Sequence, residues 1–121
     1  MRIIQVSPYS WDAPGGVQIH IRQLTRHLQE RGHEVLVLAP GDVPGRHGHV
    51  HIVGRTFTTW SNGSTAQISM SPRTMRNLAR AMRAFAPDVV HVHEPFCPGI
   101  SLTAVWSAPA PVVGTFHSYF D

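Results

Sequence analysis

Four short, almost uninterrupted apolar runs limit how this chain can fold. They are IIQV at 3–6, VLVLA at 35–39, VVHV at 89–92 and PVVG at 111–114. Strands of a parallel sheet that is covered on both faces have this pattern, whereas half-buried strands alternate apolar and polar residues. The runs therefore predict a buried parallel sheet.

The segments between these runs have the periodicity of helices. Four apolar residues of the first segment recur at helical spacing, namely Val17, Ile21, Leu24 and Leu28. Gly32 follows as a helix-ending glycine, so we expect a helix over 16–31. Further helices are expected over 72–85, with Pro72 near the first position, and over 97–107.

Strands are expected over 2–7, 34–39, 49–53, 65–69, 88–93 and 111–116. Because strands and helices alternate along the chain, the pattern predicts an α/β fold with a Rossmann-like parallel sheet flanked by helices.

The length and composition fit one globular domain. The chain has 121 residues, of which 42% are hydrophobic and 14% charged, and this balance excludes a disordered chain. All ten basic residues are arginine, and the net charge of +3 is too modest to indicate a nucleic-acid partner. Cys97 is the single cysteine, so no internal disulfide can form and we expect a reducing compartment. The apolar stretch before Pro8 is too short for a signal peptide or a membrane span, which favours a cytoplasmic protein.

Polar residues follow three of the expected strands, within 7–16, 93–95 and 115–118. Ligands of open parallel sheets bind at the carboxyl ends of the strands. We therefore expect these stretches to converge on one site.

Gly15 and Gly16 stand where the first helix is expected to begin. A helix amino terminus offers unpaired N–H groups and a partial positive charge, and glycine lets an anion such as phosphate approach the backbone. The spacing matches neither the dinucleotide fingerprint nor the P-loop. From these residues alone, a phosphate site and a simple tight turn are equally open.

Histidines follow or occupy two of the strands. His117 is expected at the carboxyl edge, where it can hydrogen-bond a sugar hydroxyl or stabilise a reacting group, the alternative being a structural histidine. His91 and His93 lie on one side of their strand, as a metal-binding pair does. No further ligand follows at zinc spacing, and the similar histidines at 47–51 lie in a glycine-rich loop, so we predict no metal site.

The helix over 72–85 has a stripe of basic residues at spacings of three, four and three, namely Arg73, Arg76, Arg80 and Arg83. Such a helix can lie on an anionic membrane surface. An ordinary solvated helix face has the same spacing, so both interpretations remain open.

Four stretches together resemble a known family. They are PYSWDAPGGVQIHIRQLTRHLQERGHEVLVLAP at 8–40, NGS at 62–64, DVVHVHEP at 88–95 and VVGTFHS at 112–118. The chain resembles the amino-terminal, acceptor-side domain of a GT-B glycosyltransferase of family 4, the large retaining group, and in particular the phosphatidylinositol mannosyltransferases. The likeness covers nearly the whole chain, and the stretches are specific in combination.

The resemblance implies a nucleotide-diphospho-sugar donor. Its diphosphate is expected to meet the backbone at Gly16, with Gly15 beside it. His117 matches the histidine that the family places beside the transferred sugar, where it acts in catalysis. The resemblance implies no metal and no other cofactor.

The resemblance also implies an acceptor site lined by Tyr9, Gln18 and Asn62, with Gln67 at a further acceptor position. Two positions depart from the mannosyltransferase pattern, because Ser61 stands where that subgroup has tyrosine and Gln67 where it has arginine. Glutamine carries no charge with which to hold an anionic head group. The acceptor therefore stays open between a phospholipid and another lipid or polyol.

The family has a carboxy-terminal domain that holds the nucleotide base and completes the diphosphate site. We expect 1–121 to be the acceptor-side domain of a longer enzyme, inactive by itself, that transfers a hexose such as mannose to a lipid or polyol at the inner face of the plasma membrane. Two other classes remain open. One is a GT-B transferase or epimerase with a soluble substrate, and the other is a stand-alone flavodoxin-like phosphate-binding module.

Overall fold

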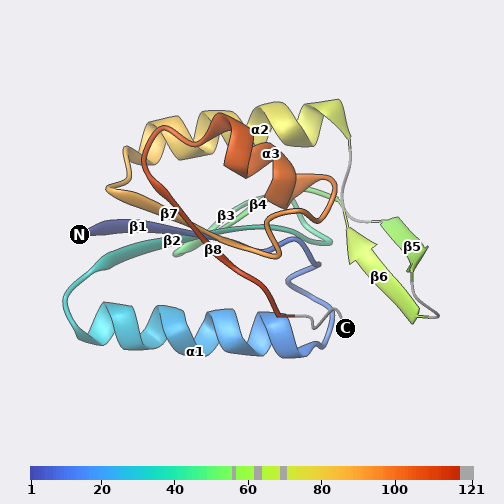
Figure 1. Ribbon diagram of the computed structural model, residues 1–121, viewed down its shortest axis with the longest axis horizontal. Helices are drawn as coiled ribbons and strands as arrows, with labels where there is room; N and C mark the ends of the chain where they lie inside the picture. Colours follow the sequence, from blue (N-terminus) through green and yellow to red (C-terminus); the bar gives the residue numbers. More distant parts are fainter. Residues whose placement is uncertain (56, 62–63, 69–70, 118–121) are drawn as a thin grey trace.

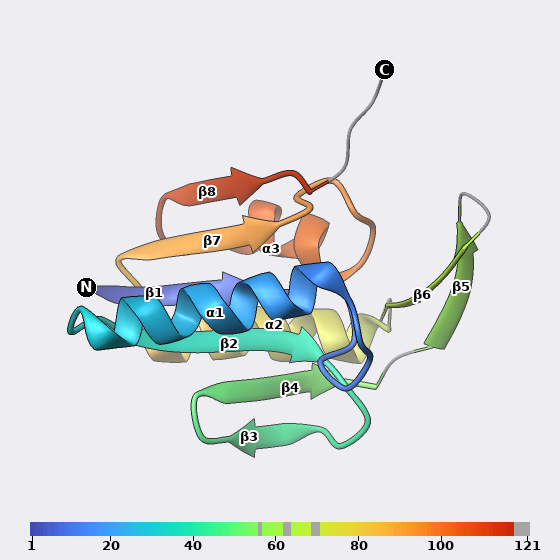
Figure 2. The ribbon, with the colours of Figure 1, turned by 90° about the horizontal axis from the view of Figure 1, so that it is seen from below.

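Six strands form one sheet in the order β3-β4-β2-β1-β7-β8. The computed structural model describes residues 1–55, 57–61, 64–68 and 71–117. The strands of the sheet are β1 (Arg2–Val6), β2 (Glu34–Pro40), β3 (Gly45–His47), β4 (Val50–Gly54), β7 (Val89–His93) and β8 (Val112–Thr115). All neighbours pair in parallel except the edge strand β3, which is antiparallel to β4 (Figure 2).

Helices cover both faces of the inner strands, as the apolar runs predict, whereas the edge strand β8, also expected to be buried, is mostly exposed. Helix α1 (Gly16–Glu30) lies on one face, and α2 (Pro72–Phe85) and α3 (Ile100–Ser107) lie on the other (Figure 1). The expected α/β fold with a Rossmann-like sheet is confirmed.

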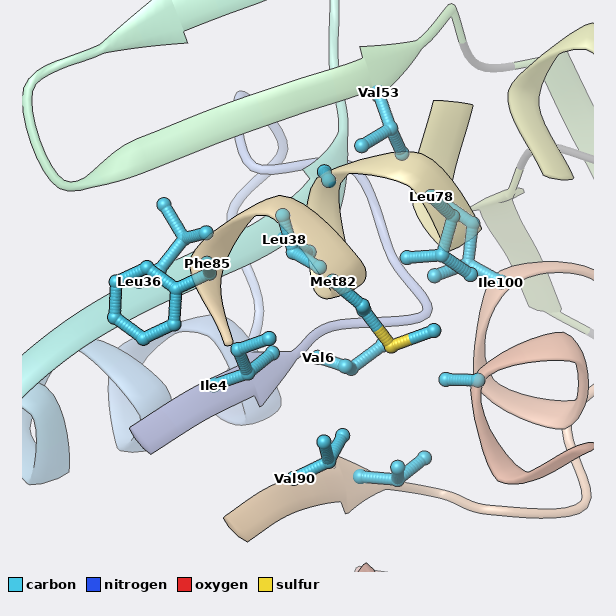
Figure 3. Packing of buried hydrophobic residues seen from close by; sticks show 13 residues of the cluster. Ile4, Val6, Leu36, Leu38, Val53, Leu78, Met82, Phe85, Val90 and Ile100 are labelled. Carbon is cyan, nitrogen blue, oxygen red and sulfur yellow. The ribbon is translucent and has the colours of Figure 1, made fainter. Parts of the chain in front are cut away.

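Two hydrophobic clusters lie on opposite sides of the sheet. On the α2 and α3 side, Leu78 and Met82 pack with Val6 and Val90 of the strands (Figure 3). On the α1 side, Ile21 packs with strand residues that include Val37 and Ala39. Because both faces of the inner strands are covered, these strands are mostly apolar on both sides, with Gln5 and His93 as buried polar exceptions.

The helix ends follow the expected signals, with one correction. Gly32 has a φ of +91°, and its N–H bonds to Gln29 O at 3.0 Å after α1. Ser71 caps α2 by accepting the N–H of Thr74, and Pro72 is its first residue. The helix expected over 97–107 was placed too early, because α3 begins only at Ile100, after Pro98 and a glycine with a φ of 98°.

The region between β2 and α2 holds more strands than expected. The expected strands over 49–53 and 65–69 correspond to β4 and to β6 (Ser64–Ile68). Strands β3 and β5 (Phe57–Ser61) were not predicted from the sequence. Strand β5 pairs with β6 in a separate antiparallel hairpin, and positions 62–63 between them lie outside the described residues (Figure 2).

Candidate functional site

The first turn of α1 is open at its amino terminus. Gly15 occupies the capping position, no side chain among the described residues caps the first turn, and that turn has no acidic residue. A Cβ added at Gly16 would meet nothing within 4 Å. The free N–H groups and the positive end of the helix dipole therefore face open space, which is what an anion needs.

The loop after β1 packs beside this helix end. Gln18 is buried, and its Nε2 donates to Ser10 O at 3.0 Å, which ties α1 to the loop. Tyr9 is half-buried. Burial raises the pKa of the Tyr9 hydroxyl, and the charges of Cys97 and Glu94 raise it further, so Tyr9 lies near the turn that follows β7.

Four histidines meet at the same edge of the sheet, one from α1, two from β7 and one from the segment after β8. The His93 and His117 rings have centroids 5.2 Å apart, and His20 of α1 lies 5.8 Å from the first and 5.2 Å from the second. His91 is 4.2 Å from His93, so the two strand residues share one face, as their spacing predicts.

Hydrogen bonds connect these rings to the sheet. His93 Nδ1 lies 3.0 Å from His117 Nε2, and His93 Nε2 lies 2.7 Å from Gln5 Oε1. His91 Nε2 lies 2.6 Å from Thr115 Oγ1. The register places these groups together, because Gln5 is aligned with His91 and His93 with Thr115.

Three of these rings, those of His91, His93 and His117, favour the neutral form. Burial lowers the pKa of His93 to about 3, and the neighbouring His91, His117 and His20 contribute to that shift. Burial also lowers the pKa of His91 and of His117, each with a contribution from His20. Glu94 acts in the opposite direction on His117, but the net shift of that pKa is downward.

Glu94 fixes the segment that carries His117. Its carboxylate accepts the backbone N–H of His117, and its own N–H donates to Thr115 O at 2.8 Å. Glu94 has a φ of 51°, a left-handed conformation that costs a non-glycine residue about 1–2 kcal/mol. Backbone strain of this kind is concentrated at functional sites.

The structure brings some of the expected site residues together and separates others. Gly15, Gly16, Gln18, Tyr9 and His117 all lie at the carboxyl edge, so the expected convergence of stretches after β1, β7 and β8 is confirmed for the described residues.

Of the remaining expected residues, those that the structure describes belong to β6 and α2. Asn62 falls outside the described residues, and Gln67 belongs to β6 of the separate hairpin. The stripe of four arginines is exposed on α2, across the sheet from α1 (Figure 1). Its exposure agrees with both interpretations of the stripe.

Two residues of this site, His20 and Gln5, were not predicted from the sequence. His20 lies four residues after Gly16, hence on the same face of α1, and that spacing was a usable signal. Gln5 is the one polar residue in the run IIQV, and a polar side chain at the centre of a buried strand needs a partner.

A hollow lies at the opposite edge of the sheet, near the amino ends of β1 and β2. A groove of about 810 Å³ is lined by Arg2, His33 and Glu34, among others. Arg2 already pairs with Glu34 and donates to Phe85 O at 2.6 Å. Since its main cation is engaged and it lies at the amino ends of the strands, this groove is the weaker candidate.

Within the described ranges, no three His, Cys, Asp or Glu side chains are grouped to hold a metal ion. The expectation that the site uses no metal and no cofactor stays a prediction. None of the helices in these ranges is long and apolar enough to cross a membrane.

The fold is a Rossmann-like α/β domain with an open helix end at the carboxyl edge of its sheet, and sequence comparison identifies it as a glycosyltransferase domain. The chain belongs to Glycosyltransferase Family 4, whose family model matches residues 14–121. Its Rossmann-like sheet is consistent with the amino-terminal domain of a GT-B fold.

Individual relatives narrow the class. The chain is 41% identical over 119 residues to the phosphatidyl-myo-inositol mannosyltransferase of Mycolicibacterium smegmatis, covering 98% of this chain and 31% of the relative. It is 40% identical over 119 residues to the protein of that name from Mycobacterium tuberculosis, covering 98% of this chain and 32% of the relative. A GDP-mannose-dependent alpha-mannosyltransferase of Mycobacterium tuberculosis is 32% identical over 108 residues, covering 85% of this chain and 28% of the relative. The chain thus spans about a third of the length of the mannosyltransferases it matches.

Proposed function

We propose that residues 1–121 form the acceptor-side domain of a retaining glycosyltransferase. The enzyme transfers mannose from a nucleotide-diphospho-sugar to a lipid or polyol acceptor. The family match and the names of the mannosyltransferase relatives support the sugar and the lipid. The relatives are about three times longer, so a second domain supplies the nucleotide site and the isolated chain is inactive.

The observation that carries the proposal is the uncapped start of α1 beside His117. In the reaction, the bond between the sugar C1 and the diphosphate breaks, and its electron pair leaves with the diphosphate. The acceptor oxygen forms the new bond to C1 and gives up its proton to an oxygen of the leaving diphosphate. The N–H groups at Gly16 and the positive helix end stabilise the charge that develops on the leaving diphosphate, so no metal is required.

His117 acts beside the transferred sugar in this scheme. Its ring is half-buried at the carboxyl edge and held by His93 at 3.0 Å, while Glu94 binds its backbone N–H. A ring fixed in this way can hydrogen-bond a sugar hydroxyl with little loss of entropy. Tyr9 and Gln18, with Asn62 and Gln67, are proposed to contact the acceptor, which is inositol phospholipid or a related polyol.

The location that we propose is the inner face of the plasma membrane. The exposed arginine stripe of α2 supplies the positive charge that anionic lipids attract, by about 1 kcal/mol for each arginine near the surface. An enzyme with a soluble acceptor is the alternative, and it would not bind vesicles.

The test enlarges Gly16. In the whole enzyme, Gly16→Val is expected to weaken binding of GDP-mannose at least about tenfold, because its side chain fills the space that faces the helix N–H groups. Binding is measured by calorimetry, and urea unfolding checks the fold. Ala84→Val, on the exposed face of α2, is the control and should bind the donor normally. Unchanged donor affinity in a folded Gly16→Val protein contradicts the diphosphate site.

A further inference from the structure

We infer that Gln5 and His93 are positioning residues that hold His117 in one tautomer, with the proton on Nε2 and a bare Nδ1. The tautomer follows from this chain's own hydrogen bonds. Its consequence for the substrate rests on the proposed function.

Gln5 occupies a position where an apolar residue would cost less free energy to bury. It lies on the central strand β1 and is fully buried, between Ile4 and Val6, which are fully buried as well. Its Nε2 has no hydrogen-bond partner within the described residues. A buried amide group without a partner costs about 1–3 kcal/mol, which a leucine would not incur. The compensating contact of the Gln5 side chain is the one its oxygen makes with His93 Nε2 at 2.7 Å.

The direction of each hydrogen bond follows from that contact. An amide oxygen only accepts, so His93 Nε2 carries the proton and donates it to Gln5 Oε1. A neutral imidazole has one proton, so His93 Nδ1 is bare and accepts. The atom 3.0 Å from it is His117 Nε2, which must therefore be the donor.

His93 must stay neutral for this chain of bonds to hold, and its surroundings ensure that. The ring is fully buried, with His20 of α1, His91 of its own strand and His117 around it, and Glu94 follows it in sequence. Burial and the three imidazoles lower the pKa of His93 to about 3. At neutral pH a second proton on His93, which would reverse the bond to His117, is strongly disfavoured.

The tautomer decides what His117 can recognise. Nδ1 of His117 takes part in no hydrogen bond within the described part of the chain and, in the neutral ring, is an acceptor only. An acceptor nitrogen pairs with a hydroxyl group and not with a phosphate oxygen, which is also an acceptor. On the proposed function, His117 therefore contacts a hydroxyl of the sugar or of the acceptor, while the diphosphate is left to the end of α1.

The first test reads the tautomer directly and needs no substitution. In ¹⁵N-histidine-labelled protein at pH 7.5, long-range ¹H–¹⁵N correlation spectra distinguish a protonated nitrogen from a bare one. We expect His117 to show protonated Nε2 and bare Nδ1, and His93 to show the same pattern. A proton on His117 Nδ1, or averaged signals from two exchanging tautomers, overturns the inference.

The second test removes the oxygen that orients the chain of bonds. In Gln5→Leu, His93 loses its acceptor, so we expect exchanging tautomers at both rings. In the whole enzyme kcat should fall about ten- to a hundredfold, the range found when a group that orients a metal-bound histidine is removed, with the KM for donor little changed.

Thr25→Val is the matched control. Thr25 is also buried with a hydroxyl that has no partner in the described residues, but it lies further along α1, outside the histidine cluster. It should change neither the spectra nor kcat. An unchanged His117 spectrum in a folded Gln5→Leu protein contradicts the role of Gln5. If the spectra behave as expected but the whole enzyme transfers no sugar, the proposed function fails and the tautomer assignment stands.

Discussion

At the scale of single residues, Gly15 and Gly16 are neighbours with different surroundings. A Cβ at Gly15 would lie 2.4 Å from Gln18 Oε1, whereas a Cβ at Gly16 would meet nothing within 4 Å. Gln18 is buried and joins the first turn of α1 to Ser10. Gly15 therefore leaves room for the Gln18 side chain, whereas Gly16 leaves open space in front of the helix end.

This difference predicts opposite effects of two adjacent substitutions on stability. Gly15→Ala should lower the free energy of unfolding by about 1 kcal/mol, because it displaces the Gln18 side chain from Ser10 and because alanine is a poor capping residue. Gly16→Ala should leave it unchanged or raise it by about 0.5 kcal/mol, since alanine restricts the unfolded chain. Urea unfolding of both variants measures the effects, and equal costs at the two positions would contradict this assignment.

At the scale of elements, α1 and α2 cover opposite faces of the sheet and expose different surfaces. All four arginines of the α2 stripe are exposed, and the apolar side of the same helix packs on the sheet through Leu78, Met82 and Phe85. Local periodicity was enough to predict both helices, because each buries a continuous apolar stripe. It could not predict β3, since one half-buried and two exposed residues in a glycine-rich segment carry no alternation. The start of α3 was misplaced because Pro98 also fits the first turn of a helix.

The arginine stripe makes a prediction that belongs to α2 alone. Replacing Arg76 and Arg80 by glutamine should weaken the affinity of the whole enzyme for anionic vesicles about 30-fold, since each arginine near the surface contributes about 1 kcal/mol of binding free energy. Sedimentation with the vesicles measures this affinity. Arg26 and Arg31, exposed at the far end of α1, give a matched pair with the same change of charge on the opposite face. That control pair should bind vesicles normally. Equal losses from both pairs would indicate a general charge effect and contradict a docking face on α2.

At the scale of the whole molecule, the candidate site is assembled from segments far apart in sequence. The rule that ligands bind at the carboxyl ends of parallel strands was sufficient to predict that His93 and His117 lie at one edge of the sheet. The 3.0 Å contact between their rings depends on the register of β7 with β8. The contact between His93 and Gln5 depends on the pairing of β1 with β7. Local sequence patterns do not show which distant strands pair. Gln5 could therefore be recognised as an unusual polar residue of β1, but its partner His93 could not be predicted.

The same assembly makes the stability of the fold depend on pH. Burial and the neighbouring histidines lower the pKa of His93 to about 3 in the folded protein, against about 6.5 in an unfolded chain. Above pH 6.5 the ring is neutral in both states and contributes no pH dependence. As the pH falls from 6.5 toward 3, the unfolded chain binds a proton that the folded protein does not. The free energy of unfolding should then decrease by up to about 1.4 kcal/mol per pH unit through this one group.

Urea unfolding between pH 7.5 and 4 measures that slope, and His91 and His117, whose pKa values are also lowered by burial, add to it. Substituting His93→Phe should reduce the slope by about 1 kcal/mol per pH unit while lowering stability at neutral pH, because Gln5 Oε1 then loses its donor. Val92→Ala is the comparison, since it also removes buried contacts next to His93 but no titrating group, and should lower stability equally at every pH. A His93→Phe protein with the wild-type slope would mean that His93 accepts a proton within the folded protein, and the neutral tautomer chain from Gln5 to His117 would then not persist below neutral pH.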